Sequence, residues 1–147
     1  MISFTMVGQS APDFTLRDHE GNEVVLSSIL KHHLVALVFY PGDDTPGCTT
    51  QLCTIRDDWA DFQAANVLVY GVNPGNADSH TKFWRHHGLK TPLLIDTEMR
   101  VARQYHAVKK FFGHEIVDRT VVLIDQQGQI RFYQRGMPST KEILAAL

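Results

Sequence analysis

The chain has 147 residues, 44% of them hydrophobic, and a formal net charge of −2 when the histidines are neutral. A chain of this length and apolar content can bury a core of its own without disulfides or structural metals. The near balance of charge argues against nucleic acid or an anionic membrane as the main partner. We therefore expect residues 1–147 to form a single domain that binds neither of them.

The apolar segments bear on the compartment. The N-terminal stretch MISFTMVGQSAPDF has no basic start followed by an apolar core, so we expect no signal peptide. The longest apolar run, Leu34–Tyr40, is far too short to span a bilayer. The expected compartment is the cytoplasm, where thiols are kept reduced and a disulfide forms and breaks instead of staying closed.

The first part of the chain predicts a hairpin, a strand and a helix. Residues 14–18 and 22–28 are short β-like runs around a turn signal and indicate an N-terminal β-hairpin. The continuous apolar run at 34–40 predicts a buried strand. A turn rich in Pro, Gly and Asp follows, and from Cys48 onward apolar residues recur at steps of three and four, which predicts a helix.

The rest of the chain alternates strands with helices. We expect, in order, a strand at 67–73, a helix at 79–87 ended by Gly88, a strand at 92–96, a helix at 99–107, a β-hairpin of 120–125 and 129–135, and a helix at 139–147 capped by Ser139 or Thr140. This alternation indicates an α/β fold, and the hairpins indicate a mixed central sheet with flanking helices.

Cys48 stands where a strand, a turn and the start of a helix follow one another. Thr45 or Asp44 is a candidate cap for that helix, and Pro46 suits its first turn. The free N–H groups and the dipole at a helix start favour the thiolate, which is the nucleophilic form of cysteine. Asp43 and Asp44 oppose a thiolate, so we expect them to point to solvent or to cap N–H groups.

Cys53, the second of the two cysteines, follows Cys48 by five positions. On an unbroken helix this spacing separates the Cα atoms by roughly 8.7 Å. Disulfides rarely span more than about 7 Å between Cα atoms. The two sulfurs therefore bond only if the first turn of the helix unwinds, which predicts one shape with free thiols and another with a disulfide.

The pattern P-x-x-x-T-x-x-C, present as Pro41, Thr45 and Cys48, is the signature of peroxiredoxins, which the chain resembles over nearly its whole length. The following TTQLCTIRDDW resembles the bacterioferritin-comigratory, or Q-type, branch, in which a second cysteine sits five residues on. GHEIVDRTVVLID resembles the segment that carries the family's catalytic arginine, which maps to Arg119. The resemblance implies a thioredoxin-like fold and reduction of hydroperoxides without a metal or organic cofactor.

The resemblance also implies a role for each site residue. The Cys48 thiolate attacks the peroxide and becomes a sulfenic acid. Thr45, Arg119 and the backbone N–H groups around Gly47 and Cys48 stabilise charge as the O–O bond breaks. Cys53 then condenses with the sulfenic acid to give an intramolecular disulfide, which a partner dithiol reduces by exchange.

The same resemblance implies the partners. Pro41 and Gly47 are expected to border the bound hydroperoxide, and thioredoxin is the family's usual reductant, with glutaredoxin as the alternative. No cysteine follows Cys53, so the chain does not match the branch that forms disulfides between subunits through a C-terminal tail. We therefore expect a monomer or a weak dimer.

Two other function classes stay open at this point. A general dithiol–disulfide oxidoreductase shares the implied fold, although its usual C-x-x-C is absent. A non-catalytic redox sensor would use the same pair of cysteines once and not turn over. The adjacent pairs His32–His33 and His86–His87 invite a metal site, but neighbouring residues on a regular element point apart, so we expect none.

Overall fold

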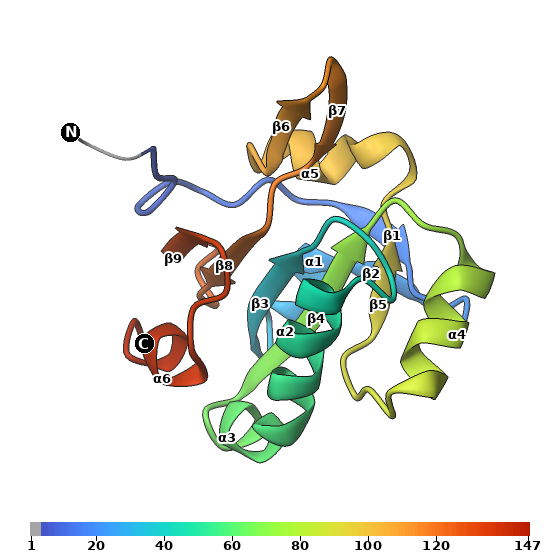
Figure 1. The fold of residues 1–147 in the computed structure, drawn as a ribbon. Helices are drawn as coiled ribbons and strands as arrows, with labels where there is room; N and C mark the ends of the chain where they lie inside the picture. Colours follow the sequence, from blue (N-terminus) through green and yellow to red (C-terminus); the bar gives the residue numbers. More distant parts are fainter. Residues whose placement is uncertain (1–3) are drawn as a thin grey trace.

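The computed structural model describes residues 4–147, so the first three residues, on which part of the signal-peptide argument rests, lie outside it. Its centre is a five-stranded sheet of order β5-β4-β3-β8-β9 (Figure 1). The strands are β3 (Leu34–Phe39), β4 (Val67–Asn73), β5 (Leu93–Ile95), β8 (Thr120–Ile124) and β9 (Ile130–Arg135). β3, β4 and β5 run parallel, whereas β8 and β9 are antiparallel additions, which confirms the predicted mixed sheet.

The middle strand β3 is apolar throughout because both of its faces are covered. Val35, Leu37 and Phe39 pack into the core on one side of the sheet, and Ala36 and Val38 pack into the core on the other. A strand that pairs on both edges and is buried on both faces needs such a continuous apolar run instead of an alternating one. The loop that leaves β3 therefore starts from a rigid position.

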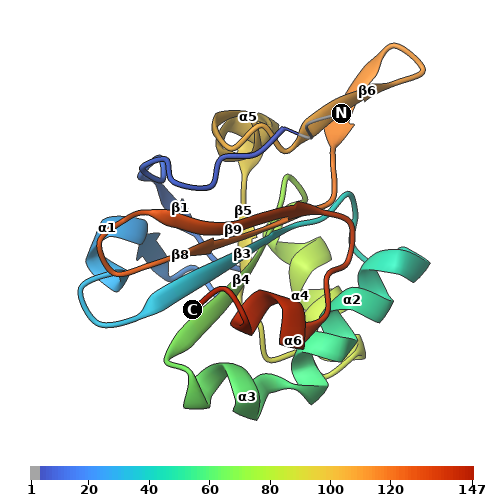
Figure 2. The same ribbon diagram turned by 90° about the vertical axis from the view of Figure 1, so that its left-hand side faces the viewer.

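Helices cover the two faces unequally, as Figure 2 shows. One face carries α2 (Pro46–Asp57), α3 (Trp59–Ala64), α4 (Ala77–His86) and α6 (Thr140–Leu144), and the other carries α1 (Leu26–Ile29) and α5 (Arg100–Gln104). The expected flanking helices are thus confirmed. Within residues 4–147, no helix combines the length and the apolar character that crossing a bilayer requires.

The N-terminal hairpin is present but shorter than predicted. β1 (Thr15–Arg17) pairs antiparallel with β2 (Glu23–Val25). Residues 26–28, expected to continue the second strand, instead belong to α1, whose Leu26 is buried. The hairpin forms a separate two-stranded sheet and does not extend the central one.

Several predicted helices have different bounds in the structure. The first helix begins at Pro46 and not at Cys48, and α4 begins at Ala77 because the Asn76 side chain caps it by accepting from Ser79 N. α5 is limited to Arg100–Gln104 because Met99, the last residue of a short 3-10 turn, has a left-handed backbone, with φ of 56°. α6 ends at Leu144, and Ser139 is its cap within a capping box.

The sequence analysis missed a second small hairpin. β6 (Val108–Phe111) pairs antiparallel with β7 (His114–Val117), and the pair projects from the body of the molecule (Figure 1). Its turn places Phe112 and Gly113 at positive φ, 50° and 78°. Two-residue hairpin turns of this kind usually contain Asn-Gly or Asp-Gly. A Phe-Gly pair is not typical of such a turn, so the sequence did not indicate this hairpin.

Candidate active site

Cys48 lies in the first turn of α2 and its side chain is fully buried. Thr45 is the N-cap residue, and its carbonyl accepts the Thr49 N–H at 2.9 Å. Pro46 has no N–H, so the N–H groups of Gly47 and Cys48 are the ones that the helix leaves without an intrahelical acceptor. These donors and the helix dipole favour a negative charge on the sulfur.

Arg119, directly before β8, contacts the sulfur of Cys48 although it is distant in the sequence. Its Nη2 lies 3.3 Å from Cys48 Sγ, and its Nη1 donates to Gln51 Oε1 at 2.8 Å. The register that pairs Phe39 with Thr120 sets the residue before β8 beside the end of β3, where the Cys48 loop begins. Sheet register thus explains why residues 71 positions apart meet.

Gly47 leaves the space that this contact needs. A Cβ atom at this position would lie 3.0 Å from Arg119 Nη2, closer than ordinary packing permits. Gln51, one helical turn after Cys48, holds the second guanidinium nitrogen. The sequence analysis did not single out Gln51, although its spacing from Cys48 places both on one face of the helix.

Thr45 is at the predicted N-cap position, but its hydroxyl does not cap the helix. The hydroxyl donates to the Gly42 carbonyl at 3.0 Å, inside the loop that precedes the helix. Pro41 is exposed at the start of that loop. The structure therefore gathers Thr45, Gly47, Cys48 and Arg119 at one end of the helix, with Pro41 at the mouth of the loop.

Asp43 neither points to solvent nor caps a helix N–H, contrary to the sequence-based expectation. Its side chain is only 6% exposed, and its carboxylate accepts from Tyr40 Oη at 2.7 Å and Ser79 Oγ at 2.6 Å and faces His80 Nδ1 at 2.6 Å. Burial alone opposes its charge, but hydrogen bonds from His80, Ser79 and Tyr40 outweigh burial and lower the pKa of Asp43. The carboxylate of Asp43 is therefore turned toward α4 and bound there by Ser79 and His80.

His80 is fully buried and both of its ring nitrogens face acceptors. Nδ1 faces Asp43, and Nε2 lies 3.3 Å from the carbonyl of Asn73 and 3.1 Å from that of Leu94. A ring nitrogen that carries a hydrogen donates to these acceptors, so the ring is held between the Asp43 carboxylate and two backbone carbonyls. His80 and Ser79 were not identified from the sequence, because they reach the loop only through tertiary packing.

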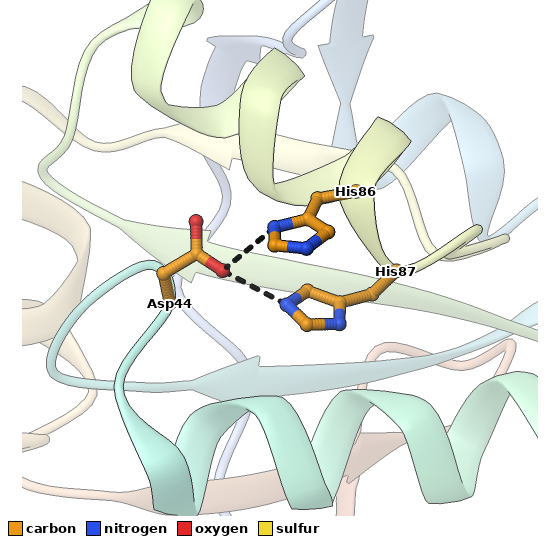
Figure 3. A group of neighbouring side chains, drawn as sticks. All are labelled: Asp44, His86 and His87. Atoms are coloured by element: carbon orange, nitrogen blue, oxygen red, sulfur yellow. Dashed lines mark hydrogen bonds and ion pairs between the residues drawn. The ribbon is translucent and has the colours of Figure 1, made fainter.

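Asp44, the neighbouring carboxylate, is exposed and binds the end of the same helix. His87 Nε2 lies 2.8 Å from Asp44 Oδ1, and His86 Nδ1 lies 3.8 Å from the same oxygen (Figure 3). The two imidazoles stack, with ring centroids 4.5 Å apart. The expectation that adjacent histidines point apart is wrong here, because His87 is the C-cap and has left the helical conformation.

Cys53 is half-buried on α2 and packs against the core beneath that helix. Both cysteines are free and are not at disulfide distance while α2 is intact. Arg56 and Asp57, near the end of the same helix, form an ion pair, with Nη2 and Oδ1 3.0 Å apart. The reduced arrangement thus matches the first of the two predicted shapes.

Two hollows bear on where a substrate fits. The larger, of about 460 Å³, is lined by residues such as Asp13, Asp96 and Arg100, and neither cysteine contributes to it. A second hollow, of about 300 Å³ and mostly apolar, lies between α2 and α6, and Gln51 is one of its lining residues. The aromatic pair Phe111 and Phe112 is exposed on the β6–β7 hairpin and lines neither of these two hollows.

Residues 7–133 match the AhpC/TSA family, and the chain belongs to that family. It is 38% identical to peroxiredoxin Bcp of Bacillus subtilis over 84% of this chain and 81% of that protein. It is 41% identical to a putative peroxiredoxin Bcp of Coxiella burnetii over 84% of each chain. The relatives place it among the Bcp/Q peroxiredoxins, as the resemblance of the segment after Cys48 implied.

Solved structures agree with this placement. The peroxidoxin BcpB of Mycobacterium tuberculosis superposes with a TM-score of 0.88 over 97% of this chain and 96% of that one, at 28% identity. The bacterioferritin comigratory protein of Xanthomonas campestris superposes with a TM-score of 0.82 over 90% and 88%, at 25% identity. The fold is therefore the thioredoxin-like fold of peroxiredoxins, and the chain is a thiol-dependent peroxidase.

Proposed function

We propose that the chain reduces hydrogen peroxide and organic hydroperoxides with the Cys48 thiolate and recycles the oxidised sulfur through a Cys48–Cys53 disulfide. The observation that carries this proposal is the 3.3 Å contact between Arg119 Nη2 and Cys48 Sγ at the start of α2. A guanidinium at this position stabilises both the thiolate and the negative charge that develops on the peroxide.

In the first step the Cys48 thiolate attacks the terminal oxygen of the hydroperoxide. A sulfur–oxygen bond forms as the O–O bond breaks, and the departing oxygen takes a proton and leaves as water or an alcohol. The sulfur is oxidised to a sulfenic acid and the peroxide is reduced. Arg119 and the free N–H groups of Gly47 and Cys48 are assigned the role of stabilising the negative charge that develops on the peroxide oxygens.

Thr45 and Pro41 are assigned to substrate placement. The Thr45 hydroxyl donates to the Gly42 carbonyl, which leaves its lone pairs to accept a hydrogen bond from the O–H of the hydroperoxide. Pro41 is exposed at the mouth of the same loop, and Gly47 keeps the approach to Arg119 open. These contacts would align the O–O bond with the sulfur.

In the second step the Cys53 thiol condenses with the Cys48 sulfenic acid. The sulfur–sulfur bond forms and the oxygen leaves as water, so no further oxidant is needed. A dithiol partner then reduces the disulfide by exchange, taking it as its own disulfide. Thioredoxin suits this role and glutaredoxin is the alternative.

The apolar hollow between α2 and α6 is assigned to the organic part of larger hydroperoxides. Gln51 borders the hollow and also binds Arg119, which connects it to the Cys48 contact. Ile55, Val121 and Ile143 supply apolar walls. Hydrogen peroxide needs no such site, so the hollow supports the wider substrate range.

We further propose one domain over residues 1–147, a cytoplasmic location and a monomer or weak dimer. The two packed faces of a single sheet support the first of these. The intramolecular position of both cysteines on α2 supports the last, because resolution then needs no second subunit.

Peroxide consumption coupled to thioredoxin, thioredoxin reductase and NADPH tests the proposal. We expect Cys48→Ser to abolish turnover, because a hydroxyl is a far poorer nucleophile at neutral pH. Cys53→Ser should reduce one equivalent of peroxide and stop as a sulfenic acid, visible as one added oxygen in the mass. Sustained turnover by Cys48→Ser, or a wild type that never loses two hydrogens, would contradict the assignment.

A further inference from the structure

The cluster of Asp44, His86 and His87 has the composition of a transition-metal site. Its three candidate ligand atoms, Asp44 Oδ1, His86 Nδ1 and His87 Nε2, all lie within 4.8 Å of one another. Within residues 4–147 this is the only group of three or more His, Cys, Asp or Glu side chains that meets such a limit. Imidazole and carboxylate ligands suit Zn²⁺ and related divalent ions.

The distances fit a single ion. Two ligands at a bond length of 2.0–2.1 Å in a tetrahedral site are about 3.3 Å apart. The two recorded nitrogen–oxygen separations, 2.8 and 3.8 Å, lie on either side of that value. Figure 3 shows both imidazoles turned toward the same carboxylate oxygen from the end of α4. Small side-chain movements would therefore place all three atoms around one ion.

The surroundings support part of this geometry in advance. His87 is only 22% exposed and its ring packs edge-on against Phe83. Arg56 donates to the His87 carbonyl, which fixes the backbone at the end of α4. His86 is 73% exposed, so the fourth position of an ion held here would face solvent. Arg56 is itself paired with Asp57, which reduces its repulsion of a cation.

We propose that Asp44, His86 and His87 form a binding site for a divalent transition-metal ion such as Zn²⁺, and that the bound ion ties the Cys48 loop to the end of α4. Asp44 has a left-handed backbone, with φ of 57°, two residues before α2 begins at Pro46. An ion that fixes Asp44 therefore restrains the chain that must move when the first turn of α2 opens. This second part rests on the proposed function, whereas the binding itself does not.

Binding is tested by titrating Zn²⁺ into protein that carries Cys48→Ser and Cys53→Ser, because thiols would bind the ion themselves. Isothermal titration at pH 7.5 should show one ion per chain. In this background we expect His86→Ala, His87→Ala and Asp44→Asn each to weaken binding at least about tenfold. His32→Ala with His33→Ala is the matched control, since His33 faces the amide of Asn66 and no carboxylate.

The control should bind Zn²⁺ like its parent. Equal affinity in the control and in all three ligand variants would overturn the site. His86→Ala is the variant least able to disturb the fold, because His86 is exposed and the His87–Asp44 contact remains. Thermal unfolding of each variant without metal checks that a lost site is not a lost fold.

The effect on the loop is tested in protein with both cysteines. Disulfide formation after one equivalent of hydrogen peroxide is followed by quenched mass spectrometry, with and without Zn²⁺. We expect Zn²⁺ to slow this step several-fold in the wild type and in His32→Ala/His33→Ala, but not in His86→Ala/His87→Ala. Equal slowing in all three would assign the effect to the thiols, and no slowing in any would overturn the tie between metal and loop.

Discussion

Arg119 is the residue that we propose to act most directly on the chemistry of Cys48, because its side chain contacts the sulfur. Its guanidinium contacts the sulfur with one nitrogen and Gln51 with another, so its direction is fixed at two points. A positive charge held in this way is ready before the peroxide arrives and needs no reorganisation during the reaction. We therefore expect Gln51 to act by positioning Arg119 and not on the peroxide.

We expect Arg119→Ala to slow the attack on peroxide by about 10²–10³, the usual loss for one charge-stabilising contact. Rapid mixing with hydrogen peroxide, followed by intrinsic fluorescence, measures that step separately from recycling. Arg131→Ala is the matched control, because Arg131 is an arginine of β9 that pairs with Asp125. An attack rate like that of the wild type in Arg119→Ala would mean that another group stabilises the charge.

Gly47 separates stability from activity at a single position. Its helical site has an ordinary backbone, so Gly47→Ala should stabilise the fold by up to about 1 kcal/mol through helix propensity. The added Cβ would lie 3.0 Å from Arg119 Nη2, so the guanidinium would have to shift and its contact with the sulfur would be disturbed. We therefore expect a higher unfolding temperature and a slower attack on peroxide in the same protein.

Denaturant unfolding and rapid mixing on Gly47→Ala check the two effects. A variant that gains stability and keeps the full attack rate would show that the guanidinium moves aside without cost. One that loses stability would show that the crowding is felt by the helix itself.

At the scale of the element, α2 places Cys48 at its start and keeps it apart from Cys53. Cys48 and Cys53 belong to the same uninterrupted helix, Pro46–Asp57, which keeps their Cα atoms roughly 8.7 Å apart. A disulfide therefore requires the first turn to open. Thr50 already donates its hydroxyl to the Pro46 carbonyl, a contact of the type that weakens a helix slightly.

Replacing Thr49 and Thr50 with Ala should strengthen this turn by some tenths of a kcal/mol each. We expect the double variant to form its disulfide more slowly and to accumulate sulfinic acid at lower peroxide, because the sulfenic acid waits longer. Mass spectrometry after graded peroxide additions measures both products.

Amide exchange across 48–58 in the reduced and oxidised proteins is the direct check on the opening of α2. Protection should fall on oxidation if the first turn unwinds. Equal amide protection in the reduced and oxidised proteins would contradict the proposed opening of α2.

At the scale of the whole molecule, α4 holds the loop that carries the active cysteine. Asp43 binds Ser79 and His80 inside the protein, and Asp44 contacts His87 at the surface. Tyr40, directly after β3, also donates to Asp43. The pKa of Tyr40 is raised well above its ordinary value, mainly by burial and also by the charge of Asp43. The two successive aspartates thus bind the loop before α2 to α4, one through buried contacts and the other through exposed contacts.

The Asp43 contacts predict a definite dependence of stability on pH. The pKa of Asp43 is lowered from its ordinary value of 3.8, so its stabilisation is present above 3.8 and is lost as the pH falls through the folded-state value. We expect Asp43→Asn to lower the free energy of unfolding by about 1–3 kcal/mol at neutral pH. The difference from wild type should shrink on acidification below pH 3.8.

Urea unfolding of both proteins from neutral to acid pH measures this difference. Glu23→Gln is the control, because Glu23 is exposed on β2. A constant difference between Asp43→Asn and wild type at every pH would show that the carboxylate charge is not what stabilises the loop.

Most of the chemistry is local in the sequence, which is why it was predictable. Pro41, Thr45, Cys48 and Cys53 lie within thirteen consecutive residues, and helix geometry alone relates the two sulfurs. The inner strands β3, β4 and β8 were equally clear, because strands buried on both faces need continuous apolar runs. The β6–β7 hairpin was missed because Phe112 adopts a positive φ that a Phe-Gly pair does not announce.

Contacts between distant segments were decided only by the tertiary structure. The segment resemblance suggested Arg119, but the pairing of β3 with β8 is what brings it to Cys48. Nothing in the sequence near Asp43 indicates that His80 contacts it, because that contact depends on how α4 packs against the sheet. The spacing of residues within one segment was enough to predict the candidate reactive groups, because the backbone geometry of an α-helix is the same from one protein to another. The partners that hold those groups follow from register and packing, which depend on the whole chain at once.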